Sequence, residues 1–85
     1  MRLEVLDMPT IFIIHGYRFF FFSNEGKEPI HVHVEKGEKY AKFWLHPIRL
    51  VYNYKFASPE LGKIKNIIEI RKVQIEEKWN EYFNI

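Results

Sequence analysis

The 85-residue sequence contains no cysteine, which excludes a disulfide framework and a thiolate zinc site. It has no apolar stretch near the roughly 20 residues of a membrane-spanning helix, because runs such as Phe19–Phe22 are far too short. Neither sign of charge dominates: 13 Lys and Arg against 11 Asp and Glu leave a formal net charge of +2. That balance excludes a strongly basic nucleic-acid-binding arm. The absence of cysteine fits a reducing environment, so we expect a cytoplasmic protein with no membrane segment.

The chain is rich in aromatic residues, which make up 18% of it and include eight phenylalanines. This composition argues against disorder and favours a packed core. A length of 85 residues suits one domain. A domain this small buries only roughly 60–65% of its unfolded surface, so it needs a dense core or a partner.

Five segments have the β-branched and aromatic composition that is typical of strands, and turn residues separate them. The predicted strands are Thr10–His15, Tyr17–Ser23, Ile30–Glu35, Glu38–Leu45 and Ile48–Tyr54. Two-residue turns are predicted at His15-Gly16 and Lys36-Gly37, because glycine accepts a positive φ without steric cost.

The C-terminal third has the pattern of an amphipathic helix. Apolar side chains recur there at three- and four-residue steps, at Leu61, Ile64, Ile68, Ile75, Trp79 and Tyr82. This predicts a helix from Pro59 to Tyr82 that is capped by Ser58, with a break near Lys72 as the alternative. The predicted fold class is α+β: an antiparallel β-meander of four to five strands, packed on one face by a C-terminal amphipathic helix.

The third and fourth strands divide their side chains cleanly between two faces, because side chains alternate along a strand. If the turn is at Lys36-Gly37, one face carries only apolar side chains: Ile30, Val32, Val34, Ala41, Phe43 and Leu45. The opposite face gathers His31, His33, Glu35, Tyr40, Lys42, Trp44 and His46. We expect the apolar face to pack on the helix, which leaves the histidine face for solvent or for function.

One hypothesis for the histidine face is a site for one divalent metal ion. His31 and His33 point the same way and lie roughly 6.5–7 Å apart along the strand, so both imidazoles can reach one ion. Glu35 or His46 would be the third ligand. The His-x-His spacing alone is weak evidence, because any two alternate strand residues satisfy it.

A second hypothesis needs no cofactor and uses the same face for RNA cleavage. It requires a general acid, a general base and cations near the phosphate. The candidate acid and base residues are His31, His33 and His46. The candidate RNA contacts are Arg18 and Lys42 for phosphate, and Tyr40 and Trp44 for base stacking. A solvated face and a non-catalytic protein-binding face are the remaining interpretations.

The first two strands raise the question of a partner, because they are apolar on both faces and one helix covers only one side. Either these strands are central and covered on both sides, or a partner covers the other side. We expect a partner, either a second copy in a homodimer or a small cognate partner protein. Arg18 belongs to this region. If the second connection turns near Gly26, Arg18 falls beside Glu35, where it would form a salt bridge or a phosphate site.

Several ordered motifs resemble one small prokaryotic family, known as domain of unknown function 4160. They are Met8-Pro9-Thr10-Ile11, Gly16-Tyr17-Arg18-Phe19-Phe20-Phe21, Ser23-Asn24-Glu25-Gly26, Glu28-Pro29, His31-Val32-His33-Val34-Glu35, Ala41-Lys42-Phe43-Trp44-Leu45 and Trp79-Asn80-Glu81-Tyr82-Phe83. The resemblance covers residues 8 to 83. It implies a single domain over 8–85 that follows an N-terminal extension over 1–7. The chain departs from the family pattern at Ile30 and His46, where members usually have proline and aspartate.

The resemblance also implies a genetic context, since such genes often lie in pairs that are predicted to be toxin–antitoxin modules. The sequence-based hypothesis is a toxin-like component that cleaves or binds RNA. The alternatives are a non-catalytic antitoxin-like or regulatory protein, and a metal-binding protein or small metalloenzyme. Gene arrangement alone carries no mechanism.

Overall fold

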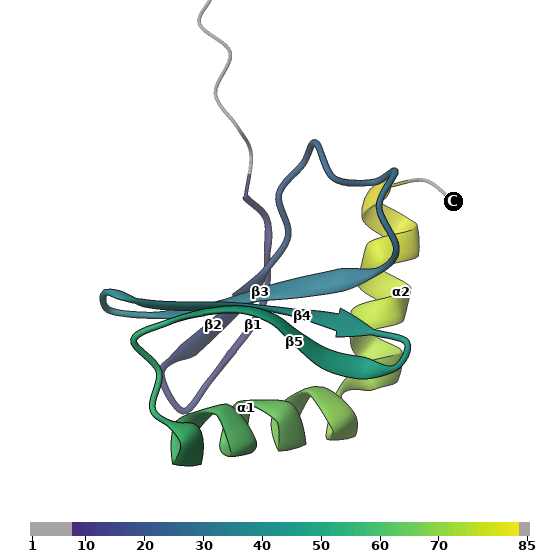
Figure 1. The fold of residues 1–85 in the computed structure, drawn as a ribbon. Coiled ribbons are helices and arrows are strands. Elements are labelled where there is room, and N and C mark those ends of the chain that lie inside the picture. The colour runs from purple at the N-terminus through teal and green to yellow at the C-terminus, as the bar shows by residue number, and fades with distance from the viewer. Residues whose placement is uncertain (1–7, 84–85) are drawn as a thin grey trace, which may run out of the picture.

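A computed structural model describes residues 8–83, which form five strands followed by two helices (Figure 1). The strands are β1 (Thr10–Ile14), β2 (Tyr17–Phe20), β3 (His31–Lys36), β4 (Lys39–Leu45) and β5 (Ile48–Tyr54), and the helices are α1 (Ser58–Ile70) and α2 (Lys72–Phe83). All neighbouring strands are antiparallel and the sheet order is β1-β2-β3-β4-β5. This confirms the α+β meander. The expected extension over 1–7 lies outside the described residues.

The two tight turns show how glycine sets the register. The turn at His15-Gly16 is confirmed, since Ile14 pairs with Tyr17 and both turn residues have positive φ. The turn expected at Lys36-Gly37 is instead at Gly37-Glu38, because Lys36 pairs with Lys39. Gly37, with φ of 59°, therefore takes the first turn position rather than the second. The correction moves the pairing by two residues, so each side chain stays on its predicted face.

The second strand is shorter than expected. It ends at Phe20 instead of Ser23, and residues 21–30 leave the sheet as a long loop before β3 begins at His31 rather than Ile30. The amide nitrogen of Phe21 donates to the Pro9 carbonyl oxygen at 3.2 Å, beyond the last strand residue. The early end of β2 is what frees the loop to fold back across the sheet (Figure 1).

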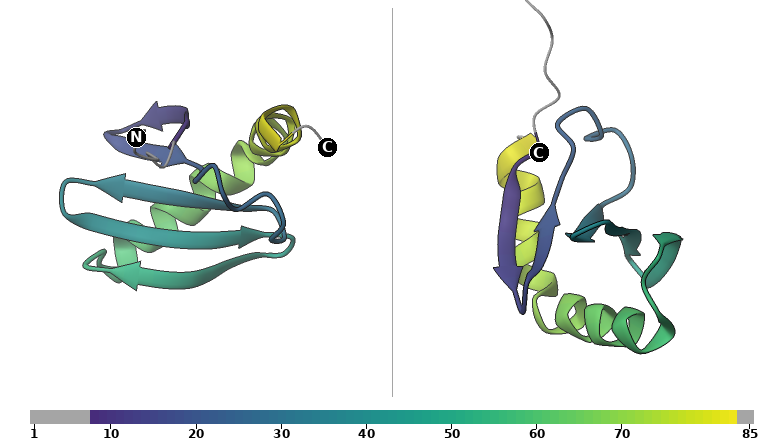
Figure 2. Two further views of the ribbon diagram at one scale, coloured as in Figure 1. Left: turned by 90° about the horizontal axis from the view of Figure 1, so that it is seen from above. Right: turned by 90° about the vertical axis from the view of Figure 1, so that its left-hand side faces the viewer.

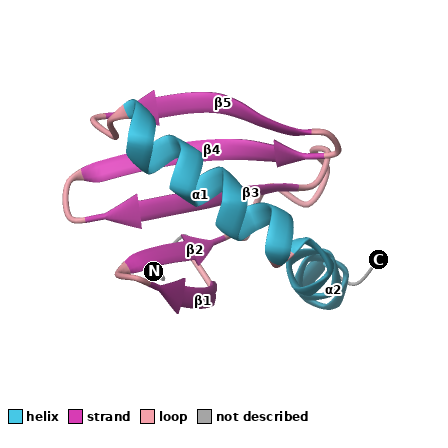
Figure 3. Ribbon diagram, turned by 90° about the horizontal axis from the view of Figure 1, so that it is seen from below, coloured by secondary structure: helices cyan, strands magenta, loops and turns pink. Residues whose placement is uncertain are grey.

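The C-terminal segment forms two helices that meet at Arg71, which bears out the alternative of a break and corrects the single helix Pro59–Tyr82. Arg71 has φ of −100° and ψ of 13°, outside ideal helical values. Helix α1 crosses one face of the sheet, and α2 turns away from α1 beside the end of β2 and the start of β3 (Figures 2 and 3). The N-cap of α1 is Ala57 rather than Ser58, and its amide nitrogen donates to Glu60 at 3.5 Å. No helix in residues 8–83 is long and apolar enough to cross a membrane.

The core lies between the sheet and the helices, as the alternation predicts. The apolar side chains of β3 and β4 enter it together with those of both helices: Val32, Val34, Ala41, Phe43, Leu45, Ile64, Ile68, Ile75 and Trp79. Together they make one continuous cluster.

The opposite side of β2 is also covered, but by the chain itself. Phe20 is only 1% exposed. Its ring lies 5.4 Å from the rings of Phe22 and His33, and the Arg18 guanidinium lies 4.4 Å above it. Ile13 in β1 remains 65% exposed. The chain itself therefore covers Phe20, as the alternative without a partner expects, whereas Ile13 is left exposed. A partner stays a prediction.

Candidate functional site

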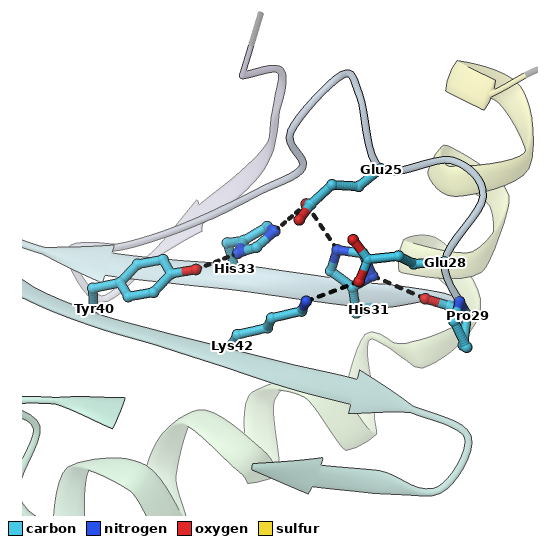
Figure 4. Close-up of polar contacts among 7 residues, drawn as sticks. All are labelled: Glu25, Glu28, Pro29, His31, His33, Tyr40 and Lys42. Atoms are coloured by element: carbon cyan, nitrogen blue, oxygen red, sulfur yellow. Dashed lines mark hydrogen bonds and ion pairs between the residues drawn. The ribbon is translucent and has the colours of Figure 1, made fainter. Parts of the chain in front are cut away.

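Two histidines and one glutamate converge on the side of the sheet away from α1 (Figure 4). His31 and His33 alternate along β3, which places both rings on the same face. The Oε1 atom of Glu25, from the β2–β3 loop, lies 2.9 Å from His31 Nε2 and 2.6 Å from His33 Nε2. One carboxylate oxygen therefore contacts both imidazoles.

The other nitrogen of each ring is also held. His31 Nδ1 lies 2.8 Å from the Pro29 carbonyl oxygen, and His33 Nδ1 lies 2.6 Å from the Tyr40 hydroxyl. This pattern, in which Nε2 faces a shared point and Nδ1 is tied to a carbonyl or a hydroxyl, is the one that orients metal-binding histidines.

The donors and acceptors around His31 show that the site needs a positive charge. A carbonyl oxygen only accepts, so His31 Nδ1 must donate its proton to Pro29. In a neutral imidazole, Nε2 then presents a lone pair to Glu25 Oε1, which is also an acceptor. Two acceptors 2.9 Å apart need a positive charge between them. Either a second proton on His31 or a metal ion supplies it.

His33 has no such conflict, because the Tyr40 hydroxyl can donate to Nδ1 while Nε2 donates to Glu25. Burial lowers the pKa of His33 and outweighs the pull of the Glu25 charge, which favours the neutral ring. Burial and the Glu25 charge together raise the pKa of Tyr40 to about 12, so its hydroxyl keeps its proton. Burial raises the pKa of Glu25, but hydrogen bonds from both imidazoles outweigh burial and lower it, which favours the carboxylate. The bond from His31 forms only in the state in which its Nε2 carries the second proton.

The two histidines of the cluster are closed off from solvent, which sequence alternation alone does not predict. His31 is 0% and His33 is 1% exposed, so this part of the face is not a solvated surface. Loop 21–30 is fastened over it at two further points. Glu28 pairs with Lys42 at 3.0 Å, and a Cβ added at Gly26 would lie 2.5 Å from Cδ1 of Phe83 in α2. Only glycine allows the loop to approach α2 so closely.

Some of the residues singled out in the sequence lie around this cluster. Tyr40 bonds to His33, and the rings of His31 and Trp44 are 5.7 Å apart. Lys42 Nζ lies 4.9 Å from the Trp44 ring centre. These three neighbours border the cluster from β4.

The other predicted residues lie apart from it. His46 is exposed beyond the end of β4 and its Nε2 is 3.4 Å from Glu76. Arg18 pairs with Glu35 at 2.9 Å, which confirms their predicted adjacency and occupies both charges. Glu35 is therefore not in the cluster, and Glu25 stands where a third ligand was expected.

Glu25 is the residue that reasoning from the sequence missed. It belongs to the Ser23-Asn24-Glu25-Gly26 motif, yet no strand or helix periodicity relates a loop residue to a sheet face. The available signal was an acidic residue six positions before His31, in a loop long enough to fold back.

Comparison with known proteins assigns the chain to a family. Neither the curated proteins nor the solved structures contain a match to this chain. The family described as "Domain of unknown function (DUF4160)" matches residues 16–80 of the 85, a range that includes Glu25, both clustered histidines and most of α2. The chain therefore belongs to the DUF4160 family.

Proposed function

We propose that this chain is a small divalent-metal-binding protein whose ligands are Glu25, His31 and His33. The observation that carries the proposal is the pair of acceptors, His31 Nε2 and Glu25 Oε1, that face each other at 2.9 Å, with the His31 side chain fully buried and the Glu25 side chain 18% exposed. A metal ion satisfies both acceptors without a buried imidazolium. It also takes His33 Nε2 as a ligand once the His33 proton lies on Nδ1, where it is donated to the Tyr40 hydroxyl oxygen.

The donor set fits a borderline first-row ion such as Zn²⁺, which binds imidazole nitrogen and carboxylate oxygen. The three ligand atoms lie within 4.8 Å of one another. Metal–ligand bonds of about 2.0–2.1 Å in a tetrahedral site separate ligand atoms by roughly 3.4 Å. Binding therefore requires Glu25 to withdraw from the imidazoles by about 0.5–0.8 Å. It also sets the two Nε2 atoms roughly 3.4 Å apart, a pair that the structure places within 4.8 Å.

Three protein ligands leave the fourth position of a tetrahedral site to water, whereas structural zinc sites are usually closed by four protein ligands. The burial of both histidine rings nevertheless favours a structural role for the ion, since it limits access to that fourth position. The ion would join the β2–β3 loop to β3, because it draws one ligand from the loop and two from the strand. In a domain of 85 residues with a limited core, such a link adds stability that packing alone does not provide.

The number of metal ions per chain tests this proposal, measured by elemental analysis of protein prepared without a polyhistidine tag. We expect about one Zn²⁺ per chain after saturation and dialysis. The chain offers a matched control, because it has four histidines and only two are in the cluster. The double variant His31→Asn/His33→Asn should bind none, while His15→Asn/His46→Asn should keep one. Wild-type protein that retains no ion would contradict the proposal.

We further propose that the chain is the toxin-like component of a two-protein module and that β5 forms its protein contact, with a second copy of this chain or with the cognate protein. This strand is at the edge of the sheet, and several of its apolar side chains are exposed: Leu50, Val51, Tyr52 and Tyr54. Monomeric proteins rarely leave such patches bare. Val51 is an extra residue between the Leu50–Phe43 and Tyr52–Lys42 pairs, and such a bulge disfavours direct strand addition. The exposed side chains themselves are therefore the expected contact.

Light scattering on the purified chain tests for the simplest partner, a second copy. We expect a mass above that of the 10.4 kDa monomer. Val51→Lys, at an exposed position, should return the protein to a monomer without unfolding it. A wild-type monomer at high concentration would contradict self-association.

RNA cleavage by His31, His33 and His46 stays a prediction with less geometric support. His46 is outside the cluster, and the other two rings are buried, so loop 21–30 would have to lift before a phosphate could reach them. If the chain inhibits growth when it is expressed alone, His31→Asn/His33→Asn should abolish the effect in a folded protein. Retained toxicity would remove both residues from the mechanism.

A further inference from the structure

A pocket of about 270 Å³ lies where the β4–β5 turn meets the start of β3. Its lining residues are Pro29, Ile30, Trp44, His46, Pro47 and Arg49. Small-molecule sites measure roughly 300–1,000 Å³, so this pocket suits a ligand of about one nucleotide or less. It combines an aromatic ring with two side chains that can donate to an anion.

Arg49 stands out among the arginines of the described residues. Arg18 pairs with Glu35 and Arg71 bonds to Gln74, whereas Arg49 has no hydrogen-bond or ion-pair partner within residues 8–83. Its guanidinium offers five donors in a planar fork that matches a phosphate or a carboxylate. Arg49 is exposed and lines the pocket, so its guanidinium is open to an anionic ligand that enters there.

Trp44 lies directly opposite Arg49 in the β4–β5 register. Its ring is half-buried and is steadied by two neighbours, since Lys42 Nζ lies 4.9 Å from its centre and the His31 ring packs against it at 5.7 Å. Glu28 holds that lysine in turn at 3.0 Å. A fixed indole beside a free guanidinium offers stacking and anion binding within one site.

We propose that this pocket binds a nucleotide, with the base stacked on Trp44 and the phosphate held by Arg49. Stacking on an aromatic side chain accepts any base, and a charge-assisted, bidentate Arg–phosphate pair supplies most of the affinity. His46, at the rim, is a second donor for the phosphate once it leaves Glu76. The nucleotide is either free or part of single-stranded RNA. None of the three residues is a ligand in the proposed metal site, so this inference stands apart from it.

Calorimetric titration of the wild-type protein with AMP, adenosine and a single-stranded oligoadenylate tests the proposal at one fixed salt concentration. We expect Arg49→Gln to weaken phosphate-bearing ligands at least tenfold, and Arg49→Lys to weaken them less because it keeps the charge. The matched control is Lys63→Gln, which removes an exposed cation from α1 that also has no partner within the described residues. It should change affinity less than twofold. Saturation by AMP identifies a free nucleotide, and binding of the oligonucleotide alone identifies RNA.

The NMR signals of the two indole N–H groups test where the ligand binds. Trp44 borders the pocket, whereas Trp79 is buried in the core and reports on the fold. Bound ligand should shift the Trp44 signal well beyond that of Trp79. Three results would overturn the proposal: no binding of AMP or RNA at millimolar concentration, adenosine binding as tightly as AMP, or equal losses in Arg49→Gln and Lys63→Gln.

Discussion

Replacing Glu25 with glutamine is expected to remove nearly all of the stabilisation that Zn²⁺ gives this domain. For the wild-type protein, Zn²⁺ at 100 times its Kd should raise the free energy of unfolding by about 2.7 kcal/mol. An amide has no negative charge for the ion. If the affinity falls 100-fold, the same Zn²⁺ concentration adds only about 0.4 kcal/mol. Urea unfolding of Glu25→Gln, with Zn²⁺ and with a chelator, measures this difference.

The same substitution at Glu28 is the control for this experiment. Glu28 is in the same loop, but it pairs with Lys42 and does not contact the histidines. Glu28→Gln should keep the full Zn²⁺ increment and lose no more than about 1 kcal/mol overall, the usual scale of a surface ion pair. The samples with chelator distinguish a metal ion in the site from a second proton on His31. If a second proton on His31 is what lies in the site, Glu25→Gln changes the stability of chelated protein and the Zn²⁺ increment is absent from the wild type as well.

Truncating Trp79 to alanine is expected to cost about 3–5 kcal/mol of the free energy of unfolding, the usual range for a large buried aromatic side chain. Trp79 is 4% exposed, and only Ile75 accompanies it among the buried residues of α2. Its ring lies 4.4 Å from Phe83, 5.2 Å from Phe21 and 5.1 Å from His31. It therefore joins α2 both to the start of loop 21–30 and to the candidate site.

The loss is large for a small domain, whose total stability is about 5–15 kcal/mol. Urea unfolding and the helical circular dichroism signal measure it, because α2 should fray once its main anchor is gone. Asn80→Ala is the control, since Asn80 is the next residue in α2 and is exposed. It should stay within about 0.5 kcal/mol of the wild type. Equal stabilities for the two variants would show that α2 does not depend on Trp79.

Local rules predict the strands well because they act between neighbours in the chain. The alternation of Val32 and Val34 with His31 and His33 gives the correct two faces of β3. It does so even though the turn is displaced by one position, because a shift of two residues in pairing preserves side-chain direction. Where the local signal is ambiguous the prediction fails. The run through Phe22 looks like one strand, but β2 ends at Phe20.

The candidate site was only half predictable for the same reason. His31 and His33 were identified by their spacing, and Arg18 was correctly placed beside Glu35 by counting from the expected turn. Alternation also places His46 on the histidine face. In the structure His46 instead lies past the last residue of β4, and its side chain contacts Glu76 in α2. Alternation holds only while the chain stays extended, so it does not extend past the end of a strand.

The sequence alone determined the fold class, the two faces of the strands, the first tight turn and the amphipathic character of the C-terminal third. Each of these depends on the period of the side chains or on the φ preference of a few residues. Tertiary structure alone decided that loop 21–30 folds over the histidines and brings Glu25 to them. That path depends on contacts between distant segments, such as Gly26 against Phe83 and Glu25 with His31 and His33. No pattern of neighbouring residues encodes such contacts, since they form only when the whole chain has packed.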